Sequence, residues 1–147
     1  KVKDTPAALP LGRAEVLRDG TDLALWALGP WVQDALALAA RLEREHGLAA
    51  AVVNARFVKP LDTELLLEMA GSHDLLVTVE EGCVQGGAGS AVAEALSAAG
   101  VNTPLMMLGL PDEFVEHGDP AKLLALCGLD AEGIEQAVRE RRAQLSA

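Results

Sequence analysis

The sequence predicts a three-layer α/β domain: a mostly parallel sheet of about five strands, helices on both of its faces, and one antiparallel edge strand. Short apolar runs alternate with segments of helical periodicity along most of the chain. The runs are continuous, which is typical of parallel strands that are buried on both faces. One more short run precedes them and ends at Asp19-Gly20, a dipeptide that favours a hairpin.

The first residues are predicted to lie outside the folded domain. Residues 1–11 contain Pro6 and Pro10 and have little periodicity, so we expect a tether there and a domain over 12–147. The chain begins at Lys1 without a methionine, and we expect it to be a fragment of a longer protein. A proteolytic remnant and an engineered piece are both compatible with that start.

The expected elements follow from local patterns. Residues 13–17 are predicted to form the edge strand, which would pair with the first core strand through the Asp19-Gly20 hairpin. Aspartates that precede apolar periodicity predict helix starts at Asp62, Asp119 and Asp130, and Gly47 predicts a helix end. The remaining expected ranges are strands 23–28, 49–54, 75–80 and 104–108, and helices 31–46, 62–70, 90–100, 119–128 and 130–145.

Composition narrows the classes of partner. A length of 147 residues suits one domain. The formal net charge of −10 argues against nucleic acid and anionic membranes, which need a basic face. No apolar run approaches the length of a membrane span, so we expect none. Cys83 and Cys127 lack metal-site spacing; free thiols in a reducing cytoplasm are the simpler expectation, and a disulfide stays open.

The most distinctive stretch joins a predicted strand to a helix through four glycines between Gly82 and Gly89. One interpretation is a cradle for a phosphate or dinucleotide at a helix N-terminus. The other is a tight crossover without a ligand. The dinucleotide fingerprint requires a third glycine where this chain has Val92, and no Lys-Ser or Lys-Thr pair follows, so the crossover is favoured.

Charged residues at the predicted strand ends are the next candidates. Glu80 and Glu81 are adjacent on a strand and should point to opposite faces, so helix capping or interface hydrogen bonding is favoured over acid–base chemistry. Arg56 and Lys59 could hold a phosphate or carboxylate. Pairing with an acid such as Glu80 or Asp62, or with another domain, is the favoured interpretation.

Histidines and serines do not form a catalytic constellation in the sequence. His46, His73 and His117 lie near predicted helix ends or in loops and are expected to be surface or capping residues. His117 stands between two acids, Glu116 and Asp119. Ser90 and Ser97 have no evident base. We therefore predict no catalytic, cofactor-binding or metal-binding residue in this chain.

Several motifs occur in a characteristic order: Arg-Phe-Val-Lys-Pro-Leu-Asp at 56–62, Val-Thr-Val-Glu-Glu at 77–81, and Gly-Gly-Ala-Gly-Ser at 86–90. A further set comprises Gly-Leu-Pro-Asp at 109–112, Phe114, His117-Gly118 and Gly-Leu-Asp at 128–130. Together they resemble the C-terminal domain of transketolase-like thiamine diphosphate enzymes, over about residue 12 to the end. The last set resembles the members that condense pyruvate with D-glyceraldehyde 3-phosphate.

This resemblance implies a parent enzyme that releases CO2 and forms 1-deoxy-D-xylulose 5-phosphate, the first step of non-mevalonate isoprenoid synthesis, which also feeds thiamine and pyridoxal synthesis. It implies thiamine diphosphate for the carbanion chemistry, Mg²⁺ to anchor the diphosphate, and a homodimer. The family's Gly-Asp-Gly metal motif is absent here. Its catalytic glutamate and phosphate-binding arginines lie in the middle domain. We expect this segment to be inactive alone, and to pack on the N-terminal and middle domains and support the dimer.

Two related enzymes are the alternatives. The beta subunits of 2-oxoacid dehydrogenases share the Pro-Leu-Asp and Val-Glu-Glu motifs, and transketolases are the other relatives. In either case this segment would act as a docking module for a partner protein. The motifs after residue 109 argue against both alternatives.

Overall fold

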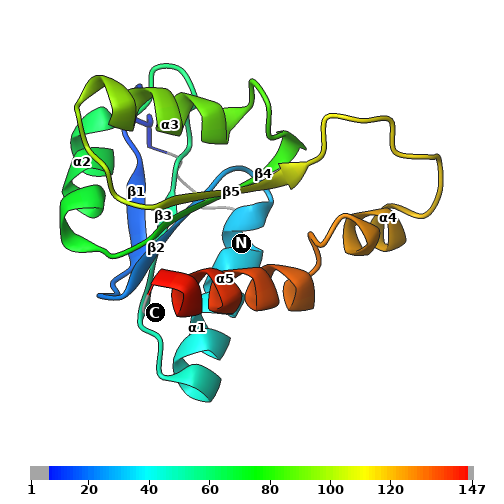
Figure 1. Ribbon diagram of the computed structural model, residues 1–147. Coiled ribbons are helices and arrows are strands. Elements are labelled where there is room, and N and C mark those ends of the chain that lie inside the picture. The colour runs from blue at the N-terminus through cyan, green and yellow to red at the C-terminus, as the bar shows by residue number, and fades with distance from the viewer. Residues whose placement is uncertain (1–6, 146–147) are drawn as a thin grey trace.

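The computed structural model describes residues 7–145 and confirms the predicted α/β class. Helices flank a five-stranded sheet in three layers (Figure 1). In chain order the elements are β1 (Glu15–Arg18), β2 (Leu23–Ala27), α1 (Trp31–His46), β3 (Ala50–Asn54), α2 (Thr63–Ser72), β4 (Leu76–Cys83), α3 (Ala88–Ala98), β5 (Leu105–Leu110), α4 (Pro120–Leu126) and α5 (Ala131–Leu145).

The strand order is β1-β3-β2-β4-β5, and only β1 runs antiparallel to its neighbour among the described strands. Every residue of β2 is buried, as are the first four of β3. Burial on both faces explains the continuous apolar runs, because neither face of these strands meets water. Strand β2 is central: β3, the next strand in the chain, pairs with one of its edges, and β4, the strand after that, pairs with the other.

The predicted hairpin is wrong, because β1 pairs with β3 and not with β2. The Asp19-Gly20 segment is instead held against the start of β3: the amides of Thr21 and Asp22 both donate to the Ala49 carbonyl, at 3.0 and 2.9 Å. The Asp22 carboxylate accepts from the Ala49 amide at 2.6 Å. Gly20 is required for close approach rather than for a turn, since an added Cβ would lie 2.2 Å from the Ala51 nitrogen.

Two apolar layers form the core. On one face, α1 and α5 cover the sheet; on the other face, α2 and α3 do so (Figure 1). The first layer includes Leu42, Val77 and Val138, and the second includes Leu66, Leu76 and Val92, each with at most 1% of its surface exposed. Aliphatic side chains of this kind supply most of the burial free energy, which compensates for the scarcity of aromatic residues.

The helix signals are confirmed. The carboxylates of Asp62, Asp119 and Asp130 accept backbone amides three residues later, at 3.2, 3.1 and 2.9 Å. Gly47 takes a left-handed conformation at the end of α1.

Two local expectations need correction. Strand β5 continues through Gly109 and Leu110, where a break was expected, because both residues stay within reach of β4. The helix expected over 119–128 is shorter, at Pro120–Leu126, and has no buried residue. Its apolar side chains Leu123 and Leu124 are only half-buried.

Residues 1–6 of the expected tether lie outside the described residues, and the domain boundary at residue 12 stays a prediction. Within 7–145, none of the helices combines the length and apolar character that a membrane crossing demands.

The contact of Gly20 with β3 leads to a stability prediction. Gly20→Ala should lower the free energy of unfolding by about 1–3 kcal/mol or more, because the new methyl group overlaps the β3 backbone. Chemical denaturation of the chain would measure it. Gly71→Ala in α2 is the matched control: its Cβ would meet nothing within 4 Å, and the change should be neutral or stabilising by up to about 1 kcal/mol. Equal stability of the two variants would contradict the packing described for Gly20.

Candidate functional site

The carboxyl ends of the parallel strands meet at one edge of the sheet, which is where open α/β sheets bind ligands. Most sequence candidates lie at this edge. Arg56 follows β3, Glu80 and Glu81 lie in β4, and the glycine turn connects β4 to α3.

Glu80 caps α3, as the sequence favoured. Its side chain is buried, with 5% of the residue exposed. One carboxylate oxygen accepts the Ala88 amide at 2.7 Å and the other accepts the Gly89 amide at 2.8 Å. These amides are two of the donors that a helix N-terminus leaves without an intrahelical partner, and the helix dipole favours a negative charge there. An acidic side chain of this chain thus occupies the position that an anion would take.

The glycines make room for this carboxylate. A Cβ on Gly87 would lie 2.3 Å from Glu80 Oε2, and a Cβ on Gly109 in β5 would lie 3.0 Å from Glu80 Cγ. On Gly89 a Cβ would lie 2.7 Å from the Thr78 hydroxyl oxygen. Glycine at these positions lets α3 and β5 close around the Glu80 side chain, which confirms the close crossover.

The turn also satisfies its own polar groups. The Ser90 hydroxyl donates to the Val84 carbonyl at 2.8 Å and accepts the Gly86 amide at 3.0 Å. Gly86 has φ +76°, a left-handed conformation that glycine adopts without strain. Ser90 therefore stabilises the turn, and its hydroxyl is engaged in backbone contacts.

Glu81 is exposed, whereas Glu80 is buried. The opposite orientation expected for adjacent strand residues is confirmed, and the two carboxylates do not face each other. Between the pairs Val79↔Leu108 and Cys83↔Leu110, β4 advances four residues while β5 advances two. This bulge directs Glu80 under α3.

Arg56 forms an ion pair with Glu15 of β1, rather than with the predicted Glu80 or Asp62. Its backbone has φ 55°, and its amide donates to the Asn54 side chain at 3.1 Å. Lys59 is exposed at the surface.

Asp62 is engaged elsewhere. It accepts the Ala14 amide at 2.9 Å, in addition to its capping bond. Arg13 lies 3.5 Å from the same carboxylate.

The three histidines have different environments. His73 ends α2, and its ring nitrogens lie 2.9 and 3.0 Å from the Met69 and Gly20 carbonyl oxygens, so it is the capping residue expected. His117 is exposed in the loop before α4. His46 contacts Glu135, a residue of α5 that the sequence did not single out.

The two cysteines are free thiols, as expected, and both are half-buried. Cys83 Sγ lies 3.7 Å from an Asp112 carboxylate oxygen.

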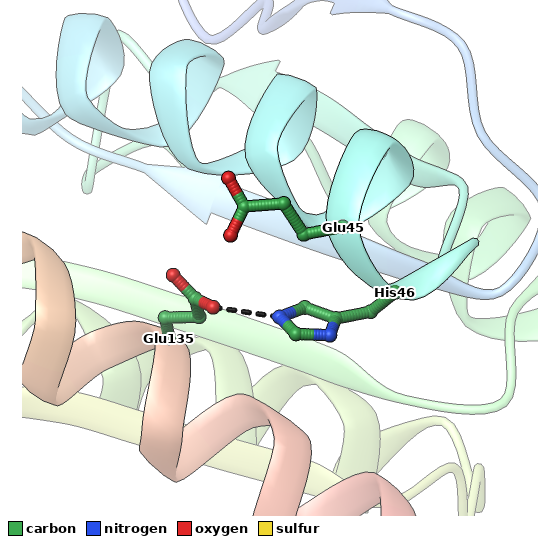
Figure 2. Close-up of side chains that lie close together, drawn as sticks. All are labelled: Glu45, His46 and Glu135. Atoms are coloured by element: carbon green, nitrogen blue, oxygen red, sulfur yellow. Dashed lines mark hydrogen bonds and ion pairs between the residues drawn. The ribbon is translucent and has the colours of Figure 1, made fainter.

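Figure 2 shows a cluster between α1 and α5 that consists of Glu45, His46 and Glu135. His46 Nε2 lies 2.7 Å from Glu135 Oε1, and Arg41 forms an ion pair with the other oxygen of Glu135. The hydrogen bond with His46 is the main cause that lowers the pKa of Glu135 below its usual 4.5; burial opposes this effect and the charge of Arg41 adds to it. His46 and Glu135 are 89 residues apart in the sequence, so no local pattern could have revealed their contact.

A second unexpected feature is the set of large apolar side chains exposed along the segment that follows β5, namely Phe114, Val115 and Leu126, called here the distal face. Phe114 is fully exposed at 106%, and Leu126 is 82% exposed. Figure 1 shows the loop before α4, and α4 itself, extending away from the sheet beyond β5. Several large apolar side chains exposed along one segment favour a contact surface for a partner. Phe114 belongs to the motifs after residue 109, but its sequence context did not indicate a site residue.

Comparison with protein families matches residues 12–134 to the transketolase C-terminal domain. Among curated relatives, the chain is 59% identical over 144 residues to the 1-deoxy-D-xylulose-5-phosphate synthase of Methylibium petroleiphilum. It is 58% identical over 145 residues to the enzyme of that name from Ralstonia nicotianae. Each match covers 95% of this chain but 22% of the relative, so the chain spans about a fifth of their length.

Among solved structures, a split-gene transketolase described as an inactive β4 tetramer matches with a TM-score of 0.84 and 41% identity. That match covers 91% of this chain and 43% of the other. A transketolase mutant from Pichia stipitis matches with a TM-score of 0.60 and 17% identity, over 90% of this chain and 18% of the other, and supports the fold alone.

The residues at the glycine turn do not fit the thiamine diphosphate that the resemblance implies. The α3 amides that would hold a diphosphate already bind Glu80, whose negative charge would repel one. The space within the turn is filled by the same side chain. The cluster in Figure 2 lies between α1 and α5 and includes an imidazole, whereas Mg²⁺ prefers oxygen ligands.

Removing the Glu80 charge should destabilise the chain. Glu80→Gln has one carbonyl oxygen for two amide donors, and we expect a loss of about 1–3 kcal/mol in the free energy of unfolding. The exposed Glu81→Gln is the control and should change it by less than about 0.5 kcal/mol. Chemical denaturation measures both variants.

Micromolar binding of thiamine diphosphate and Mg²⁺ to the chain, weakened by Gly87→Val, would restore the interpretation of the glycine turn as a phosphate cradle.

Proposed function

The chain belongs to the transketolase C-terminal domain family, and from this premise we propose that it is the C-terminal domain of a 1-deoxy-D-xylulose-5-phosphate synthase. The observation that carries the proposal is 58–59% identity to synthases of that name across 95% of the chain. Identity to the split-gene transketolase is lower, at 41%, which favours the synthase over the transketolase alternative.

The parent enzyme condenses pyruvate with D-glyceraldehyde 3-phosphate and releases CO2. Thiamine diphosphate supplies the carbanion chemistry, and its binding residues and those of Mg²⁺ belong to the N-terminal and middle domains. The filled α3 N-terminus supports this assignment, because it leaves this segment no anion site at the usual edge of the sheet. We also infer that the parent enzyme is a cytoplasmic homodimer, and the family resemblance supports this inference.

This segment is a structural domain that packs on the remainder of the enzyme and supports the dimer. The distal face is the contact surface, because a fully exposed phenylalanine and a mostly exposed leucine belong to one segment, the loop before α4 and α4 itself, that has no buried residue. About four-fifths of the length of the curated relatives has no counterpart in this chain, and part of that polypeptide is the occupant.

The activity can be tested on the enzyme that contains the whole polypeptide. With pyruvate, D-glyceraldehyde 3-phosphate, thiamine diphosphate and Mg²⁺, we expect equimolar CO2 and 1-deoxy-D-xylulose 5-phosphate by mass spectrometry. The control reaction supplies xylulose 5-phosphate and ribose 5-phosphate, the substrates of a transketolase. Sedoheptulose 7-phosphate as the main product would favour transketolase, and acyl transfer to a lipoyl protein would favour a 2-oxoacid dehydrogenase.

The docking role leads to a prediction for Phe114. In the full-length enzyme, Phe114→Ser should lower stability by about 1.5–3 kcal/mol, because a buried phenylalanine is lost from the contact. The 147-residue chain should keep its melting temperature, since Phe114 is already exposed there. Val16→Ser on β1, at the opposite edge of the sheet, is the control and should leave both proteins within about 0.5 kcal/mol. An unchanged melting temperature of the full-length Phe114→Ser enzyme would contradict docking through the distal face.

A further inference from the structure

The cluster of Glu45, His46 and Glu135 brings one imidazole and two carboxylates together from two elements. Glu45 and His46 end α1, and Glu135 lies in the second turn of α5 (Figure 2). Each side chain offers one donor atom, and the three atoms lie within 4.8 Å of one another. Helices α1 and α5 pack over the same core layer, which includes Leu42, Ile134 and Val138, so the backbones that carry these donors are held in place.

Arg41 orients the Glu135 carboxylate. Its guanidinium forms an ion pair with Glu135 Oε2 through Nε and donates to the Ala131 carbonyl at 2.5 Å. The other oxygen, Oε1, is left facing His46. Metal-binding carboxylates are commonly oriented in this way by a second polar group, which reduces the reorganisation that binding requires.

We propose that this cluster binds a divalent transition-metal ion of the Zn²⁺ class, through His46 Nε2, Glu135 Oε1 and a Glu45 carboxylate oxygen, with water completing the coordination. Zn²⁺ accepts mixed nitrogen and oxygen ligands at about 2.0–2.2 Å in tetrahedral sites. The imidazole favours Zn²⁺, Ni²⁺ or Cu²⁺ over Mg²⁺ and Ca²⁺.

The rearrangement that binding requires is small. Two ligands of a tetrahedral site lie about 3.3 Å apart at these bond lengths, so the 2.7 Å contact between His46 and Glu135 must open by about half an ångström, whereas donor atoms up to 4.8 Å apart must close. The Nε2 proton that makes this hydrogen bond must also leave, to Nδ1 or to solvent, before Nε2 binds the ion. Glu45 must exchange its exposed ion pair with Arg44 for the metal. An exposed pair contributes little, so this exchange costs little.

The nearby charges set the affinity. Arg41 and Arg44 offset the two carboxylates, so the site lacks the excess negative charge of a strong metal site. We therefore expect a dissociation constant on the order of 10 to 100 µM for Zn²⁺ rather than nanomolar binding. Because the ligands come from two helices, the ion joins the end of α1 to α5 and stabilises the folded chain by mass action.

The test is calorimetric titration of the untagged chain with Zn²⁺ alone, in a Cys83→Ser, Cys127→Ser background that removes thiol ligands. We expect one ion per chain, and a rise in melting temperature of about 9 °C at 100 times the dissociation constant. His46→Gln should weaken binding at least tenfold. The control is His117→Gln, which removes an exposed histidine from another part of the fold and should leave the affinity unchanged.

Glu45→Gln separates binding from folding. Glu45 is exposed, so the variant should keep the melting temperature of the parent in EDTA while it loses several-fold in Zn²⁺ affinity. Unchanged affinity in both His46→Gln and Glu45→Gln would overturn the proposal. The absence of any binding up to 1 mM Zn²⁺ would overturn it as well. Because neither readout involves catalysis, failure here would leave the proposed synthase function untouched.

Discussion

The bond between the Glu80 carboxylate and the N-terminus of α3 is the interaction on which the C-terminal edge of the sheet depends. It satisfies the Ala88 and Gly89 amides with a buried charge that the helix dipole favours. Burial of that charge is tolerated because both oxygens are hydrogen-bonded. Gly87 and Gly109 follow from it, since a side chain at either position would crowd Glu80, whereas a side chain at Gly89 would collide with Thr78. The β4 bulge brings Glu80 under the helix.

The same bond changes the chemical meaning of the glycine turn. A glycine-rich turn before a helix has the backbone geometry of an anion site. In this chain the anion is supplied from within, so the motif stabilises a strand-to-helix crossover. The glycine turn can therefore resemble a phosphate-binding loop in its glycine content and still belong to a domain that holds no part of the cofactor.

Helix α5 and the segment that precedes it are held by the domain to different degrees. Helix α5 buries Ile134 and Val138, and Glu135 on its side facing α1 contacts Arg41 and His46. The preceding segment, from the end of β5 through α4, is held much less by the domain: α4 has no buried residue, and Phe114 is fully exposed. The core thus reaches this segment only through half-buried side chains such as Leu124, which is why we assign its exposed apolar side chains to contacts with the rest of a larger enzyme.

The sequence by itself determined which segments form strands and helices, and where three of the helices start. Buried strands appear as continuous apolar runs, and Asp62, Asp119 and Asp130 cap helices through amides three residues away; both signals depend on near neighbours in the chain. It also determined that Glu80 and Glu81 point apart. Only the tertiary structure decided that β1 pairs with β3, that Arg56 pairs with Glu15, and that His46 meets Glu135 across 89 residues. These partners are chosen by the packing of distant segments. A local pattern such as Asp19-Gly20 favours a turn, but it does not record which strand lies alongside, and here the start of β3 offered the backbone hydrogen bonds.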